Sequence, residues 1–166
     1  MFTIDQYISS VQSNLQKHSN ELTSNLKRVI AYKFSPAIDL LDFTASIEPI
    51  NFELSIRIFS MDQNANEVFN EEDNPNLFAG SEEVLPEILY HELDNSQREA
   101  FFDFYEEHEM EILEQEQKTF ANWFSSCWKE AGGDHFELPA YLVLPEESNS
   151  YDLKKSEWVD EEEKWT

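Results

Sequence analysis

The sequence predicts an α+β fold, in which an antiparallel sheet of three to five strands packs against a long amphipathic helix and an N-terminal helix. Apolar residues recur at a helical period over residues 96–133, and they alternate with polar residues over 43–58, as in a strand. The 166 residues include 13 Phe, 6 Tyr and 4 Trp, enough for one hydrophobic core. We therefore expect a single domain over residues 1–150 and an acidic, Trp-containing tail over 151–166.

The long helix is predicted from an uninterrupted stretch that starts near Ser96 and closes at Gly132 and Gly133. Glu99 lies three residues after Ser96, as in a capping box. The segment forms either one helix or two helices bent near residues 115–117. The face opposite the apolar stripe is predicted to carry carboxylates, namely Glu106, Glu107, Glu109, Glu111, Glu114 and Glu116.

The N-terminal helix is predicted to begin after Thr3, because Gln6 completes a capping box. Residues 4–32 form either one helix or a helix broken near 18–20, and in a further alternative residues 28–34 are already a strand. Pro36 ends the segment in each case, because the residue before a proline is disfavoured in helices.

The strands are predicted from alternation and from turn residues. Residues 43–47 and 52–58 form a hairpin around a turn at 48–51, and residues 67–70 can return as a short third strand. Residues 82–93 are predicted to be a short helix with Pro86 near its start. Residues 140–144 are predicted to be a strand, bounded by Pro139 and Pro145.

The charge of the chain is strongly negative and unevenly distributed. The formal net charge is −24; residues 1–60 contain five Lys and Arg against six Asp and Glu, whereas residues 61–166 contain six against 29. Nucleic acids and anionic membranes are therefore excluded as expected partners, because they would be repelled. A basic protein partner would relieve the repulsion. The alternative is that the acidity serves solubility alone.

The expected compartment is the cytoplasm. Cys127 is the single cysteine, so no intrachain disulfide can form, and its position on the apolar face predicts a buried thiol. The N-terminal residues have no basic region followed by an apolar run, so no secretory signal is expected. No apolar segment is long enough for a transmembrane helix.

Metal and catalytic patterns are incomplete in the sequence, so we predict no cofactor, no metal site and no enzymatic activity. Asp62, Asn64, Asn66 and Asp73 have the spacing of calcium-loop ligands, but Glu67 replaces the required glycine, and a polar hairpin turn is the simpler interpretation. The histidines at 18, 91, 108 and 135 lack a partner histidine at metal spacing. We find no nucleophile elbow or phosphate-binding loop.

The candidate binding residues are acidic residues of the long helix and two tryptophans of the tail. Glu107, Glu111 and Glu114 are spaced to share a helix face, and Asp103 lies one turn earlier. Like charges at this spacing lower helix stability, which suggests a functional reason for keeping them; a solvated face is the alternative. Trp158 and Trp165 are candidate interface anchors, unless the tail docks back onto the domain.

These features together resemble the small acidic immunity proteins of bacterial polymorphic toxin systems. The similarity lies in the size, the acidity, the helix followed by a hairpin over residues 43–59, and the closing strand followed by the Trp-bearing segment YDLKKSEW at 151–158. The resemblance implies a cytoplasmic inhibitor that binds one cognate toxin, often a basic nuclease, and covers its active site or a neighbouring surface.

Two other function classes stay open. One is a small enzyme or metal-binding domain with a site of His and carboxylate side chains between the sheet and the long helix. The other is an assembly protein that forms a homodimer through the long helix.

Overall fold

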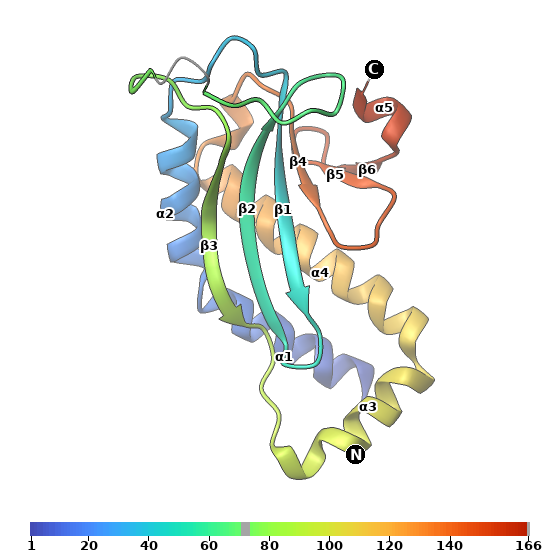
Figure 1. The fold of residues 1–166 in the computed structure, drawn as a ribbon. Coiled ribbons are helices and arrows are strands. Elements are labelled where there is room, and N and C mark those ends of the chain that lie inside the picture. The colour runs from blue at the N-terminus through green and yellow to red at the C-terminus, as the bar shows by residue number, and fades with distance from the viewer. Residues whose placement is uncertain (71–73, 166) are drawn as a thin grey trace.

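A six-stranded mixed sheet forms the centre of the protein in the computed structural model, which describes residues 1–70 and 74–165. The strand order is β3-β2-β1-β4-β5-β6 (Figure 1). The strands are β1 (Leu40–Glu48), β2 (Glu53–Met61), β3 (Ser81–Leu89), β4 (Ala140–Val143), β5 (Ser150–Asp152) and β6 (Glu157–Val159). The helices are α1 (Ile4–Gln16), α2 (Ser19–Ile30), α3 (Arg98–Glu107), α4 (Glu109–Glu130) and α5 (Glu161–Trp165), with short 3₁₀ turns at Asn95–Gln97 and Gly133–His135.

The α+β class is confirmed, but the predicted sheet of three to five antiparallel strands is wrong in the number of strands and in one pairing. Strand β4 runs parallel to β1, and the other neighbouring strands are antiparallel. Parallel neighbours need a long crossover connection. Residues 49–139 provide it, and α4 carries the chain back across the sheet to β4 (Figure 1).

The predicted hairpin is confirmed as β1 and β2, which pair in continuous antiparallel register from Leu40 and Met61 to Glu48 and Glu53. Alternation directs Phe43 of β1 and its same-face neighbours towards the helices. The Phe43 ring lies 5.2 Å from the ring of Phe124 and 5.4 Å from that of Trp128, both on α4. This contact places the core between the sheet and α4.

Helices α1, α2 and α4 lie on one face of the sheet (Figure 1). The N-terminal segment is broken, as one of the alternatives predicted, and α2 ends at Ile30, so residues 28–34 do not form a strand. Thr3 caps α1, because its side-chain oxygen accepts a hydrogen bond from the backbone N–H of Gln6 at 3.1 Å. The start of α2 is held by α4, because Trp123 Nε1 of α4 donates a hydrogen bond to Ser19 Oγ at 2.9 Å.

The short helix predicted for residues 82–93 is wrong, because most of this segment forms β3. Val84 and Leu85 are consecutive and both buried, and the pairing with β2 shifts register at this point. Such a bulge breaks the alternation that identifies a strand. Pro86 is tolerated because β3 is at the edge of the sheet.

The polar segment after β2 does not form a third strand of the hairpin. Residues 67–70 contribute one isolated bridge, between Glu67 and Met61. Asp62 Oδ1 accepts hydrogen bonds from the backbone N–H groups of Asn64 and Asn66, as expected for a polar turn. Asp73, the last residue of the calcium-loop pattern, lies outside the described residues.

The long helix is interrupted at His108, and the bend predicted near residues 115–117 is wrong. The backbone of His108 adopts φ −115° and ψ 22°, between α3 and α4. Glu116 lies within the continuous α4, and its side chain is buried. The closing glycines have different functions: Gly132 adopts a left-handed backbone with φ +100°, whereas Gly133 lets the chain pass against the Trp128 indole.

The acidic tail contributes two strands and a short helix to the fold, since β5 pairs with β4 and β6 pairs with β5. Lys164 of α5 reaches back to the sheet, where its Nζ lies 2.8 Å from Oδ1 of Asp42. Asp42 alternates with Phe43 along β1 and is therefore on the face opposite α4. The ammonium also donates to Ser150 Oγ at 3.1 Å and lies over the ring of Tyr141.

Gly133→Ala should lower the free energy of unfolding by about 1–3 kcal/mol, because the added methyl group overpacks the core. An ideal Cβ at Gly133 would lie 2.2 Å from Nε1 of Trp128. Urea denaturation measures the change. The cost should shrink in a Trp128→Phe background, where the smaller ring leaves space for the methyl group. An equal cost in both backgrounds would contradict the proposed clash.

Lys164→Met should destabilise the fold by about 3–5 kcal/mol, because it leaves the buried carboxylate of Asp42 without its cation. The double variant Asp42→Asn/Lys164→Met should recover most of that loss, since both charges are then absent. Denaturation midpoints of the wild type, the single variant and the double variant test this pattern. Lys155→Met is the matched control at an exposed tail position, with an expected change within about 0.5 kcal/mol. The ion pair is unimportant if Lys164→Met is as stable as the control.

Candidate functional site

Helix α3 and the first turns of α4 extend past the end of the sheet (Figure 1). We call residues 98–114 the acidic arm, because they contain seven Asp and Glu against one Arg. All seven carboxylate residues are exposed. Arg98 is engaged elsewhere, since its guanidinium donates to the carbonyl of Ile50. Residues 1–70 and 74–165 contain two ion pairs, Arg28–Glu82 and Asp42–Lys164, and both lie outside the arm.

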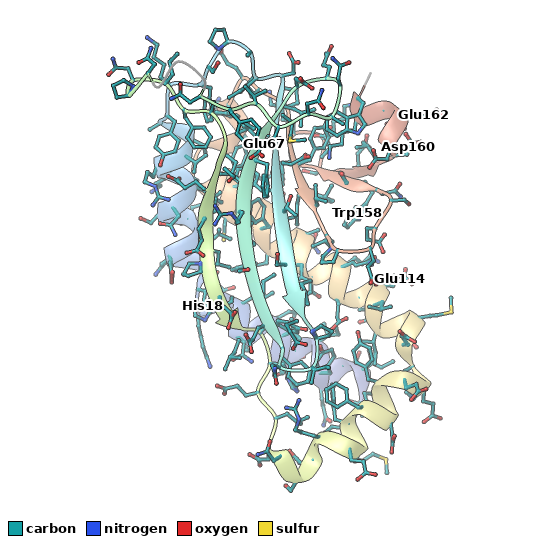
Figure 2. The ribbon with its side chains drawn as sticks, in the orientation of Figure 1. His18, Glu67, Glu114, Trp158, Asp160 and Glu162 are labelled. Atoms are coloured by element: carbon teal, nitrogen blue, oxygen red, sulfur yellow. The ribbon has the colours of Figure 1, made fainter. Side chains whose placement is uncertain are left out.

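The acidic residues that the sequence singled out are divided between the two helices of the arm. Asp103 and Glu107 lie on α3, and Glu111 and Glu114 lie on α4, so the break at His108 separates the predicted row into two pairs. Figure 2 labels Glu114 on α4. The arrangement is therefore two acidic helix faces that meet at an angle, which presents negative charge over a wider area than one straight helix would.

A depression of about 880 Å³ lies between the start of α1 and α3. Asp103 and Glu107 are at its border, and Phe2 and Phe104 supply apolar lining. Aromatic residues such as Phe2 and Phe104 are enriched in protein interfaces, whereas Asp and Glu are depleted there, so the apolar lining is the part of this surface typical of an interface.

Two large apolar side chains of the arm are exposed, and sequence reasoning missed both. Met110 is 87% exposed and Leu113 is 39% exposed, and they lie among the carboxylates of α4. The sequence contains a signal for their exposure. Both residues are apolar, yet they lie outside the apolar helical stripe and next to Glu109, Glu111 and Glu114. Exposed apolar residues within a polar surface are candidate interface anchors.

Trp158 and Trp165 are each half-buried against the domain. The ring of Trp158, labelled on β6 in Figure 2, lies 5.2 Å from that of Tyr151. Trp165 Nε1 donates to a carboxylate oxygen of Glu161 at 2.7 Å, and its ring lies 4.8 Å from Nζ of Lys164. The exposed part of each ring is what a partner can reach.

Glu116 was predicted to lie on the solvent-facing acidic side of the helix, and this prediction is wrong. The residue is only 6% exposed. Its Oε2 accepts a hydrogen bond from the hydroxyl of Tyr7 at 2.5 Å, and its Oε1 accepts one from Tyr105 at 2.7 Å. Burial raises the pKa of the Glu116 carboxyl, and the two tyrosine hydrogen bonds oppose that rise. Burial and the nearby carboxylate also raise the pKa of both tyrosines.

His91 packs against Tyr7 of this cluster and has a polar contact of its own. His91 Nδ1 lies 2.8 Å from Ser10 Oγ, and the His91 ring packs edge-on against Tyr7. Within the described part of the chain, no group of three or more His, Cys, Asp or Glu side chains could hold a metal ion. Cys127 is buried, and burial raises the pKa of its thiol.

None of the helices in the described ranges has the length and apolarity that a membrane span requires.

Comparisons with known proteins give no match to a family model, to a curated protein or to a solved structure.

Glu116→Gln should become progressively more stable relative to the wild type as the pH rises above 4.5, the ordinary pKa of a glutamate. A carboxyl whose pKa is raised in the folded state contributes most at low pH, and that contribution is lost as the pH rises through the folded-state pKa. Each unit of elevation corresponds to about 1.4 kcal/mol. Urea denaturation of both proteins from pH 4 to pH 8 measures the difference.

Glu114→Gln, on the exposed side of the same helix, is the matched control and should give a smaller change over this range. A difference between Glu116→Gln and the wild type that stays constant with pH would show that the carboxyl titrates alike in the folded and unfolded chains.

Proposed function

We propose that the protein is a non-enzymatic acidic binding protein, and specifically an immunity protein that neutralises a basic toxin by binding it. The observation that carries the proposal is the acidic arm, with its seven exposed carboxylate residues and one engaged arginine. A nuclease is the toxin class that fits best, because its cleft is built to bind phosphate and carboxylates can occupy the same positions.

The negative charge of the arm attracts a basic partner before the two proteins touch. The carboxylates of Asp103, Glu107, Glu111 and Glu114 concentrate negative potential on one protruding part of the molecule. Such a field raises the association rate with a basic partner, and it excludes acidic ones. The cost of keeping like charges close together is then offset in the complex.

Apolar contacts supply the stability of the complex once it forms. Met110 and Leu113 are exposed on the arm itself, and Trp158 and Trp165 offer partly exposed rings on the tail. A few such anchors surrounded by polar residues are typical of tight interfaces. The apolar stripe of α4 is buried within this chain, so a homodimer would have to use another face. We propose the cytoplasm as the compartment, where the buried thiol of Cys127 stays reduced.

Capture of the partner is the first experiment. The intact protein, immobilised and exposed to lysate of the source organism, should retain one basic protein in stoichiometric amount at low and at moderate salt. Mass spectrometry identifies this protein, and its activity should be lost on addition of the acidic protein. Retention only at low salt, with no effect on activity, would refute the immunity function.

Reversal of three charges on the arm should slow association with that partner. The variant Glu107→Lys/Glu111→Lys/Glu114→Lys should reduce the association rate constant at low salt by about tenfold or more, and the difference should shrink at high salt. Surface plasmon resonance measures the rates, and circular dichroism checks the fold.

The matched control reverses three exposed glutamates outside the arm, Glu21, Glu130 and Glu137. It changes the net charge equally and should slow association less. If the two triple variants behave alike, only the total charge matters and the arm is not the binding site.

A further inference from the structure

A small cavity lies beside the acidic arm, between the end of the β1–β2 hairpin, α4 and the loop after β4. Its volume is about 200 Å³. Most of its lining is apolar or aromatic, with Glu116 as the one buried carboxylate. Its lining includes Ile47, Tyr90, Tyr105, Glu116, Phe120 and Leu144.

The Glu116 carboxylate in this cavity has no cationic partner in the described parts of the chain. Both ion pairs found there involve other residues, and none of the described residues that line the cavity is Lys, Arg or His. Buried carboxylates are usually paired with a cation, because isolated charges are costly to bury. At Glu116, two neutral tyrosine hydroxyls stand where a cation is usual.

Glu116 also has unused hydrogen-bonding capacity. Each carboxylate oxygen accepts one tyrosine hydroxyl, from Tyr7 and Tyr105, but an ionised carboxylate has about four acceptor positions. Tyr7 and Tyr105 hold the carboxylate in place through these hydrogen bonds. The carboxylate can therefore accept further hydrogen bonds from a donor that enters the cavity.

We propose that this cavity binds an alkylammonium or alkylguanidinium group, with the cation at Glu116 and the aliphatic stem against Phe120 and Leu144. The aromatic rings of Tyr90 and Tyr105 add a surface that favours cations. Glu146 lines the same cavity and adds a second acidic residue. The volume is below the roughly 300–1,000 Å³ of pockets that enclose a whole drug-sized ligand, and it suits a single side chain or a small amine.

The site does not depend on the acidic arm being a docking surface. A free amine and a lysine or arginine side chain of another protein share the chemistry that the cavity recognises. The alternative to cation binding is that the Glu116 carboxyl binds a proton, because a neutral carboxyl needs no cation.

The test is a titration of the intact protein with n-butylammonium and with agmatine at constant ionic strength, followed by NMR chemical shifts of cavity residues. Both probes should shift the signals of Tyr105 and Phe120 in a saturable way, with tighter binding as the pH rises and Glu116 ionises. Butanol, which has a similar stem and no charge, should bind at least tenfold more weakly. Absence of saturable shifts with both cations, or equal binding of butanol, would overturn the proposal.

Glu116→Gln preserves the shape of the side chain and should weaken binding of both cations about tenfold or more, as expected for the loss of a charged hydrogen bond. Glu130→Gln, at an exposed position of the same helix outside the acidic arm, is the matched control and should bind as the wild type does. If Glu116→Gln binds as tightly as the control, Glu116 is not the recognising group and the proposal fails. Denaturation curves confirm that both variants fold.

Capped lysine amide and capped arginine amide distinguish the two sources of the cation. Saturable binding that Glu116→Gln abolishes would support the proposal and admit a protein side chain as ligand. Binding of the small amines without the capped residues would support it with a free amine as ligand. A failure of amine binding leaves the partner-capture result unaffected, so the two proposals are tested separately.

Discussion

The packing of Trp128 is the constraint on which the rest of the structure depends. The indole is fully buried and lies against Phe43 of β1 and against Gly133. These contacts fix the C-terminal half of α4 on the sheet. Since α4 is a continuous helix of 22 residues, its other end is carried beyond the strands. The direction of the acidic arm therefore follows from a contact in the core far from the charges themselves.

Glu116 differs from the other carboxylates of α4 because it faces the core. In a chain with a net charge of −24, an additional buried negative charge is unfavourable unless something balances it. The protein provides two tyrosine hydroxyls, from α1 and α3, which join three helices around one side chain. The cluster thus orients the arm as well as the carboxylate. Its polar contacts give a specific arrangement that apolar packing alone does not define.

Much of the fold was predictable, and the errors have physical causes. The hairpin was found because its residues alternate strictly, with one face buried. Strand β3 was missed because its bulge at Val84 and Leu85 imitates a helical pattern. Glu116 was missed because sequence spacing does not show which of many glutamates meets Tyr7, which is 109 residues away. The exposed acids of the arm were identified, but the break at His108 that divides them has no proline or glycine to signal it.

The parallel pairing of β1 with β4 has a consequence for how the chain folds. Leu41 pairs with Ala140, so the centre of the sheet closes a loop that contains most of the chain. The β1–β2 hairpin pairs segments that are adjacent in the sequence, whereas the β1–β4 pairing joins segments from distant parts of the chain. Long loops of this kind slow folding, because their entropy is lost before the distant contact is gained. We therefore expect slow folding, and while β4 is unpaired one edge of β1 is open to other chains.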